Sequence, residues 1–180
     1  EHLEDIQHKN ETIKKMQNAL ILVLADLVES RDKNTGDHVK KTAAYTEIIM
    51  KKMRELGFYP DVLTDEFMES VVNSAPLHDI GKIGIPPEVL NKPGKLSDTE
   101  FNIIKSHSAL GYEALKNISI MPELSIGAGM HHERPDGKGY PKGLKGEKIA
   151  RVAQIIAVAD TFDAMYSDRP YRKRMNFDKA

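Results

Sequence analysis

Two pairs of adjacent residues have the side chains that metal ions prefer: His78–Asp79 and His131–His132. The second pair begins the stretch HHERPDGKGYP, residues 131–141, whose glycines and prolines exclude a regular helix or strand. Neutral imidazole nitrogen and carboxylate oxygen suit first-row ions such as Fe, Mn, Zn, Co or Ni better than Mg or Ca. The residue types therefore indicate transition-metal chemistry.

Two further candidates lie on apolar helix faces. His107 shares a stripe with Ile103, and Asp160 has Ile156 one turn before it. A single such histidine or aspartate is more often a satisfied core residue, but burying a carboxylate without a cation is costly. With the two pairs, six nitrogen and oxygen ligands exceed the need of one ion that must also bind substrate. Asp79 can bridge two ions, a pair that activates water and neutralises charge on a phosphate ester.

Helices must position these groups, because no stretch of the chain alternates long enough to predict a strand. We expect an all-α fold of about six to eight helices, without internal repeats. Caps, glycines and prolines predict helices over 1–29, from Thr35 to about Leu56, from Thr64 to Asp79 with a kink at Pro76, from Ser97 to about Asn117, from Pro122 to Met130 and from Glu147 to about Met165. Residues 80–95 are predicted to form a loop with at most a short turn of helix.

The first predicted helix carries a seven-residue apolar repeat. Its two sets of positions are Leu3, Asn10, Gln17 and Leu24, and Ile6, Ile13, Leu20 and Leu27. Over residues 1–18 this favours equally a dimerising helix, whose two polar core positions fix the register, and an amphipathic helix packed on its own domain. Residues 19–29 are more apolar, so we expect them to join the core. We expect residues 1–29 to be an N-terminal dimerisation and signalling helix and residues 30–180 to be the main domain.

Composition excludes several classes of function. The 180 residues are 40% hydrophobic and 29% charged, with a net charge of -1 and no cysteine. A balanced charge gives no general attraction to nucleic acid polymers, and the longest apolar run, residues 19–25, is too short to insert in a membrane. Without cysteine there are neither disulfides nor thiolate ligands. We expect a cytoplasmic protein whose anionic ligand is drawn by a local site.

Five stretches together resemble the HD-GYP family, the phosphodiesterase branch of the HD superfamily. They are RDKNTGDH (31–38), HDIGKIGIP (78–86), KPGKLSDTEFNIIKSH (92–107), HHERPDGKGYPKGLKGEKI (131–149) and AVADTFDAMYSDRPYRK (157–173). A histidine–aspartate pair alone is a weak signal, but this combination is highly specific. The resemblance implies that residues 30–180 form an HD-GYP domain, which is an HD-domain helical bundle with extra helices and a GYP loop. It also implies hydrolysis of cyclic di-GMP at a centre of two or three metals. We expect the ring to open to pGpG, and the sequence leaves open whether a second cut to GMP follows.

The resemblance carries roles over to particular residues. The metal ligands it implies are His38, His78, Asp79, His107, His131, His132 and Asp160. Asp79 matches the bridging ligand, and Lys82 matches a lysine that stabilises phosphate charge or assists the leaving group, so these two are the catalytic residues. The residues implied to hold the dinucleotide are Gly139, Tyr140, Arg169 and Arg172.

Some positions depart from the family pattern. Members with a third metal often carry a glutamate four residues before the first histidine, where this chain has Asn34. An uncharged amide is a weaker ligand, so we expect two divalent ions, Fe or Mn first, with Zn, Ni or Co as alternatives. Ala150 and Gln154 stand where the family usually has proline and arginine, and we expect structural consequences only. The pattern continues beyond Ala180, so part of the C-terminal packing surface is expected to lie past this sequence.

Other functions remain open on the sequence. The chain could be a catalytically weak module that binds metal and cyclic dinucleotide and signals through contacts. A general HD phosphohydrolase acting on nucleotides is a further alternative, although simple HD enzymes lack the GYP segment. Cyclic GMP-AMP could replace cyclic di-GMP as the substrate. Two protein partners are expected: a second copy through the N-terminal helix, and a diguanylate cyclase-type protein through the GYP loop.

Overall fold

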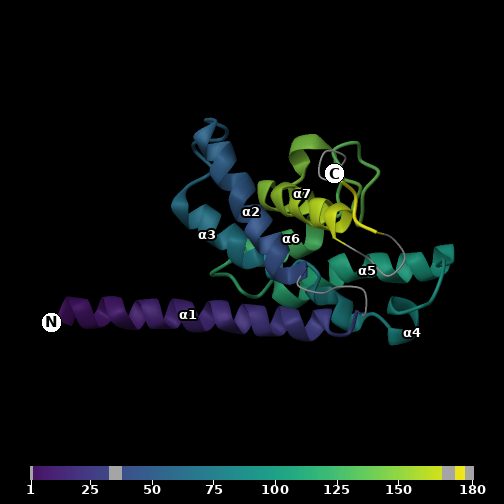
Figure 1. Cartoon of the computed structure of the whole chain (residues 1–180), viewed down its shortest axis with the longest axis horizontal. Helices are drawn as coiled ribbons and strands as arrows, with labels where there is room; N and C mark the ends of the chain where they lie inside the picture. Colours follow the sequence, from purple (N-terminus) through teal and green to yellow (C-terminus); the bar gives the residue numbers. More distant parts are fainter. Residues whose placement is uncertain (1, 33–37, 168–172, 177–180) are drawn as a thin grey trace.

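The computed structural model describes residues 2–32, 38–167 and 173–176. Within these ranges the chain is helical, without strands apart from one isolated bridge between Asp136 and Lys145, so the expected all-α class is confirmed. Its elements are α1 (His2–Glu29), α2 (His38–Glu55), α3 (Asp65–Ser74), η1 (Ala75–Leu77), η2 (Ile80–Gly84), α4 (Pro87–Leu90), α5 (Asp98–Leu115), α6 (Pro122–Met130), η3 (Gly146–Lys148) and α7 (Arg151–Tyr166), where η marks a 3-10 helix. Figure 1 shows α2, α3 and α5–α7 gathered into a body that lies along the C-terminal half of α1.

Local capping explains where several helices begin. The Thr64 side chain accepts a hydrogen bond from the backbone of Phe67 at the start of α3. At α5, Ser97 and Glu100 form the reciprocal capping box that the sequence predicted. Pro122 occupies the first turn of α6, where its missing N–H is not needed. The predicted cap at Thr35 lies outside the described residues.

Three predicted boundaries are wrong. The third helix ends at Ser74 and not at Asp79, because Pro76 cannot donate a helical hydrogen bond and the chain tightens into η1. Residues 80–95, predicted as loop with at most a short turn of helix, hold two short helices, η2 and α4. The last helix begins at Arg151 and not at Glu147, because η3 and an extended Ile149 and Ala150 precede it.

Apolar side chains form two core clusters. One joins α2, α3 and α7 through Met50, Leu63, Met68, Val71, Ala75, Val152, Ile155 and Ile156. The other joins the end of α1 to η1, α5 and α6 through Ala25, Val39, Leu77, Leu115, Leu124 and Ala128. None of the described helices combines the length and apolarity needed to cross a bilayer.

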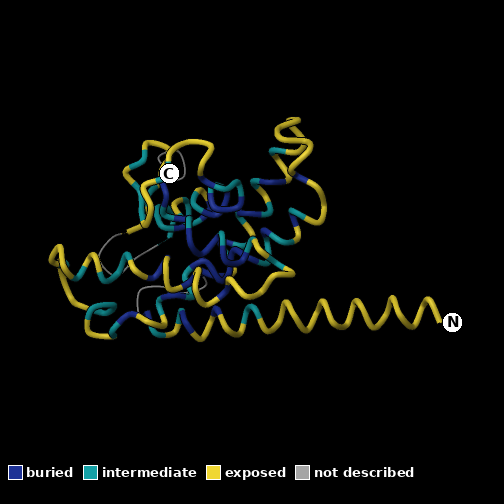
Figure 2. The backbone as a smooth tube through the Cα atoms, turned by 180° about the vertical axis from the view of Figure 1, so that it is seen from behind, coloured by how far each residue is buried: buried dark blue, intermediate teal, exposed yellow. Residues whose placement is uncertain are grey.

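Helix α1 has two apolar faces, of which one is buried against the body and the other is exposed. Ala25 and Val28 are buried against the body, as expected for the end of this helix. Leu20, Leu24 and Leu27 of the heptad stripe are 50–61% exposed, so residues 19–29 join the core on one side only. Residues 2–20 are exposed throughout, and the N-terminal part of α1 projects beyond the body (Figure 2). Farther along the helix, Lys14 forms an exposed ion pair with Glu69 of α3 at 3.1 Å. The described part of residues 1–18 buries no side chain against the body, so the alternative of a helix packed on its own domain gains no support here.

Close backbone packing sets η2 against α5. An added Cβ at Gly81 would lie 1.9 Å from the carbonyl oxygen of His107 and 2.5 Å from the nitrogen of Gly111. Both obstacles are backbone atoms of a regular helix, so they cannot move aside cheaply. Gly81 thus permits the approach that brings Asp79 and Lys82, which flank it, next to His107.

We predict that Gly81→Ala destabilises the protein by more than about 1–3 kcal/mol, the usual range for overpacking. Gly84→Ala is the matched control, because its added Cβ meets only the flexible Leu110 side chain at 2.8 Å. Chemical denaturation followed by circular dichroism measures both. Equal midpoints for the two variants would show that the approach of η2 to α5 is not tight.

Candidate metal centre

Five elements direct histidines and aspartates toward one place in the body. His38 begins α2, His78 and Asp79 lie between η1 and η2, and His107 lies in the middle of α5. His131 and His132 follow α6, and Asp160 comes from α7. The structure thus brings together side chains that are as much as 122 positions apart in the sequence (His38 to Asp160). His38, His78, His107 and His131 are buried, with exposures of 5% or less.

The ligand atoms fall into two groups that share one carboxylate. Asp79, His107, His131 and His132 each place one candidate atom within 4.8 Å of the others, and so do His38, His78 and Asp79. An aspartate common to two ligand groups has the geometry of a bridge between two ions. Asp160 joins the second group at its edge, with Oδ1 3.4 Å from Nε2 of His38.

Hydrogen bonds fix the tautomers of four histidines. His78 Nδ1 donates to the carbonyl of Ala75 at 2.7 Å, and His107 Nδ1 donates to that of Ile104 at 2.6 Å. His131 Nδ1 donates to the carbonyl of Ala128 at 2.9 Å. His38 Nδ1 donates to the Asp163 carboxylate at 2.7 Å. Carbonyl oxygens only accept, so each of those Nδ1 atoms carries the proton and a neutral ring turns a lone pair outward on Nε2. This is the outer-shell arrangement of metal-binding histidines.

The atoms left over fit a cation. Among the described residues, His78 Nε2 and Asp79 Oδ1 are buried without a hydrogen-bond partner. Oδ1 does lie 3.2 Å from His107 Nε2, but without hydrogen-bond geometry. The Nε2 atoms of His107 and His131 face each other at 3.3 Å. Opposed lone pairs and an orphaned carboxylate oxygen are unfavourable alone, and a bound cation satisfies all of them.

The electrostatics keep two of the imidazoles, those of His78 and His132, neutral and keep Asp79 ionised. Burial lowers the pKa of His78 to about 4, and burial with the neighbouring His131 lowers the pKa of His132 to about 2. Burial opposes ionisation of Asp79, but the Lys82 ammonium and nearby histidines outweigh it and hold the pKa of Asp79 well below its usual range. These protonation states are the ones that bind metal.

Asp163 is a supporting residue that sequence reasoning missed. Besides accepting from His38, it accepts from the Ser167 hydroxyl at 2.8 Å and is 1% exposed. Burial lowers the pKa of His38, but the hydrogen bond to Asp163, followed by the charges of Asp160 and Asp79, raises it overall. The only sequence signal was its spacing, since Asp163 lies three residues after Asp160 on the same helix face.

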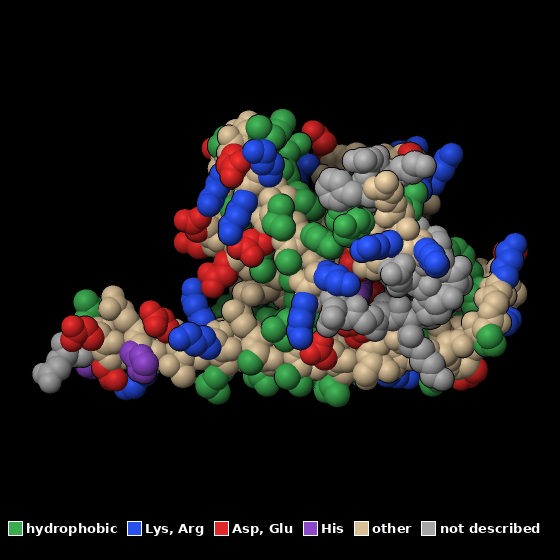
Figure 3. All heavy atoms as spheres, viewed as in Figure 1, with side chains coloured by type: hydrophobic (Ala, Val, Ile, Leu, Met, Phe, Trp, Pro, Cys, Tyr) green, Lys and Arg blue, Asp and Glu red, His purple; other side chains and the backbone are tan. Residues whose placement is uncertain are grey.

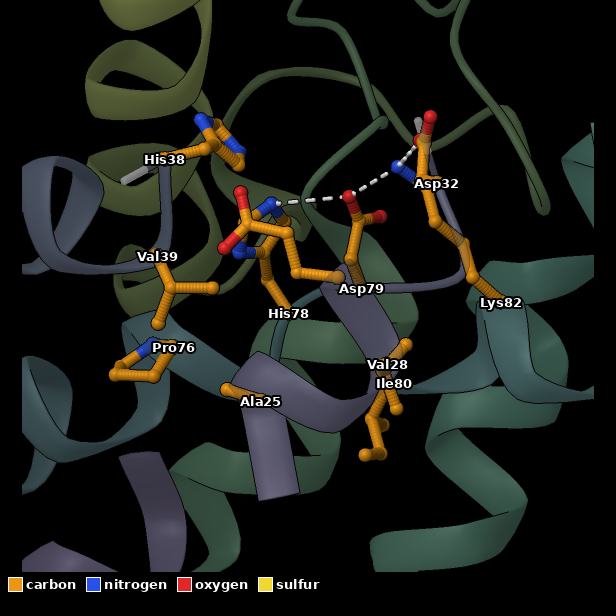
Figure 4. A pocket seen from close by; sticks show the side chains of 11 residues that line it. Ala25, Val28, Asp32, His38, Val39, Pro76, His78, Asp79, Ile80 and Lys82 are labelled. Carbon is orange, nitrogen blue, oxygen red and sulfur yellow. Dashed lines mark hydrogen bonds and ion pairs between the residues drawn. The ribbon is translucent and has the colours of Figure 1, made fainter. Parts of the chain in front are cut away.

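Lys82 is held between two carboxylates, one of which was also missed. Its Nζ lies 2.7 Å from Asp79 Oδ2 and 3.0 Å from Asp32 Oδ2, as Figure 4 shows. Burial lowers the pKa of Lys82, but Asp79 and Asp32 outweigh it and raise the pKa, so the ammonium persists. The guanidinium of Arg31 donates to the carbonyl of Ile83, so the segment that follows α1 is fastened to η2 at two points.

The GYP loop folds back over His132. The backbone N–H of Tyr140 donates to the His132 carbonyl at 3.1 Å, and the two rings lie 4.7 Å apart. Gly139 is required by this turn, because a Cβ there would lie 2.4 Å from that same carbonyl oxygen. Glu133, a third missed residue, accepts from the backbone of Lys142 (2.7 Å) and Leu144 (2.8 Å) and so anchors the loop.

A cleft of about 1000 Å³ opens beside the centre. Its wall includes His131, His132, Gly139 and Tyr140, with basic side chains farther along: Lys105, Arg134, Lys138 and Arg151. Its volume lies at the upper end of the range for small-molecule sites. The predicted phosphate contacts Arg169 and Arg172 and the departure Asn34 lie outside the described residues.

A helical bundle with a histidine cluster around a shared aspartate defines a domain that could hold metal ions, and the comparison with known families assigns it to a class. Residues 22–180 match the family model described as HD domain. A probable cyclic di-GMP phosphodiesterase of Vibrio cholerae is 36% identical over 98% of this chain and 42% of its own length. The chain therefore belongs to the HD-domain family, in its HD-GYP branch.

Other relatives show a range of substrates. A cyclic di-GMP phosphodiesterase of Thermotoga maritima is 41% identical over 88% of this chain and 41% of its own length. A 3'3'-cGAMP-specific phosphodiesterase of Vibrio cholerae is 35% identical over 89% of this chain and 33% of its own length. The chain thus spans less than half the length of these relatives.

We predict that Asp163→Ala weakens Mn(II) binding by roughly 10–100-fold, the usual effect of removing an outer-shell partner. Asp163→Asn is the informative comparison, because its amide oxygen still accepts from His38 Nδ1 while the negative charge is lost. Calorimetric titration of metal-free protein with Mn(II) measures both variants. Unchanged affinity in Asp163→Ala would mean that His38 is not a ligand.

Proposed function

We propose that this protein is a metal-dependent phosphodiesterase that opens cyclic di-GMP to linear pGpG, with a second cut to GMP. The observation that carries the proposal is the pair of ligand groups sharing Asp79, with four histidines oriented by Nδ1 hydrogen bonds. The names of the relatives support the choice of substrate. The adjoining cleft, with its basic side chains, supports an anionic ligand of dinucleotide size.

Two divalent ions, Fe or Mn in preference to Zn, Ni or Co, are proposed for the two ligand groups. His107, His131 and His132 would hold one ion, His38, His78 and Asp160 the other, and Asp79 both. When bound, such a pair supplies an activated water and neutralises negative charge on phosphate. A third ion is not proposed, because the amide of Asn34 would replace a carboxylate.

The chain's own residues have separate tasks in this proposal. The Lys82 ammonium, held toward Asp79, donates to the phosphate oxygen that gains charge or leaves. Tyr140 lines the cleft beside His132 and keeps its proton, because burial, followed by the charges of Asp79 and Asp160, raises the pKa of its hydroxyl. It can therefore donate a hydrogen bond to the dinucleotide, while Gly139 lets the loop turn. Arg169 and Arg172 are proposed to bind phosphate through their forked guanidinium groups.

We predict that protein loaded with Fe(II) or Mn(II) converts cyclic di-GMP to pGpG, as chromatography of the products would show. Asp79→Ala should lose both ions and all activity, whereas Asp61→Ala, an exposed aspartate, should keep both. Lys82→Ala should retain its metal but lose roughly 100–1000-fold in turnover, the usual effect of removing a charge-stabilising donor.

Metal content and product analysis together separate the alternatives. Metal and dinucleotide binding without turnover would favour a signalling module over an enzyme. Faster cleavage of nucleoside mono- or triphosphates would favour a general HD phosphohydrolase. If two ions remain in Asp79→Ala, the bridging role is wrong.

We also propose that α1 pairs with α1 of a second copy. The stripe Leu3, Ile6, Ile13, Leu20, Leu24 and Leu27 is 42–70% exposed. Hydrophobic side chains line the free edge of α1 in Figure 3. Because the other face already packs on the body through Ala25 and Val28, this stripe is available to a partner.

The GYP loop is proposed as a second contact surface, for a diguanylate cyclase-type protein.

We predict that Ile13→Glu converts the dimer to a monomer in light scattering, because a carboxylate at a core position of the pair would be buried. His8→Glu adds the same charge at an exposed position outside the stripe and should leave the dimer intact. Removal of residues 1–18 should act like Ile13→Glu. A dimer that survives this removal would have another interface.

A further inference from the structure

Arg151, on the wall of the cleft, is held on two sides by the protein. Its guanidinium lies over the Tyr59 ring, with Cζ 3.8 Å from the ring centroid. One of its terminal nitrogens donates to Oε1 of Gln154. The Gln154 amide is itself fixed, because its Nε2 donates to the carbonyls of Ile149 at 2.9 Å and Gly146 at 3.3 Å. The guanidinium therefore has a set orientation, unlike a solvated surface arginine.

The support beneath the guanidinium is strained. Tyr59 has φ 49°, and within the described chain no other residue except glycine has a positive φ. The left-handed region is unfavourable for a bulky side chain. The Tyr59 carbonyl holds this turn by accepting from the backbones of Val62 and Leu63, both at 3.0 Å. Strain of this kind persists where the surroundings enforce it, commonly at ligand sites.

The charge of Arg151 has no counter-ion among the described residues. In the described ranges, no carboxylate oxygen lies within 4.0 Å of a guanidinium nitrogen of Arg151, the limit for an ion pair. Glu133 lines the same cleft, but its two oxygens accept from backbone N–H groups of the GYP loop. Arg151 thus presents N–H donors and a positive charge to the cleft without a described acceptor other than Gln154.

A fixed guanidinium distinguishes the two purines. Guanine offers two acceptors, O6 and N7, that match the arginine fork, whereas adenine replaces O6 with an amino donor. We propose that Arg151, backed by Tyr59 and held by Gln154, reads the O6/N7 edge of a guanine base and so selects cyclic di-GMP over adenine-containing cyclic dinucleotides. The inference rests on the proposed function. The relatives differ in the dinucleotide for which they are named, since some are named for cyclic di-GMP and others for 3'3'-cGAMP.

The test compares three ligands, cyclic di-GMP, 3'3'-cGAMP and cyclic di-AMP, with wild type, Arg151→Lys and Arg151→Ala. Dissociation constants come from calorimetry on protein kept metal-free with a chelator, and kcat/KM comes from Mn(II)-loaded protein. We expect both variants to lose roughly 5–150-fold for cyclic di-GMP, the worth of one bidentate base contact. The loss for cyclic di-AMP should stay below about threefold, with the mixed dinucleotide between the two, because only guanine gains from the fork.

Two further variants sharpen the result. Lys138→Ala removes another positive charge from the same cleft, but this charge is not held in a fixed geometry. The binding of all three ligands should therefore weaken alike. Tyr59→Ala removes the support of the guanidinium and should reduce the preference for guanine in the same direction as Arg151→Lys. Thermal unfolding by circular dichroism checks that each variant is folded.

The outcomes separate this inference from the proposed function. Equal losses for all three ligands in Arg151→Ala would assign Arg151 to phosphate and overturn base reading, as would unchanged constants. If the loaded enzyme cleaves no dinucleotide but the metal-free protein shows the expected preference, the phosphodiesterase proposal fails and guanine reading stands. Absence of both binding and turnover overturns the two together.

Discussion

The rest of the structure depends on one constraint, which is the burial of four histidines around one carboxylate. Each ring of His38, His78, His107 and His131 has a polar nitrogen on two sides, and a buried nitrogen without a partner is costly. The protein satisfies one side with Nδ1–H donors to nearby carbonyls or to Asp163. The other side is left as converging lone pairs around Asp79. A cation joining these atoms would remove that cost, and metal binding would then contribute to the stability of the fold.

The helical architecture serves this convergence. Short 3-10 turns on either side of His78 and Asp79 place two consecutive ligands in one corner, which a continuous helix would direct 100° apart. The tight contact at Gly81 then sets these residues against α5. His131 and His132 follow the C-terminal end of α6, where the partial negative charge of the helix dipole favours a cation.

The segment that follows α1 is physically connected to the centre. The segment after α1 supplies Asp32 to Lys82, and Arg31 reaches the carbonyl of Ile83 in the same 3-10 helix as Lys82. Two ion pairs, Asp32–Lys82 and Lys82–Asp79, thus connect the segment after α1 to the shared aspartate.

The sequence by itself determined the helical class and the residue types of the metal centre. It also determined those helix starts that depend on a local cap, such as Thr64 and Ser97, because these signals act within one turn. It could not place the end of α3, since the tightening at Pro76 depends on how the following segment packs on α5. Only the tertiary structure revealed Asp32 beside Lys82, Asp163 beside His38 and Tyr59 beneath Arg151. These contacts join residues 50, 125 and 92 positions apart, and no local periodicity encodes a pairing across that separation.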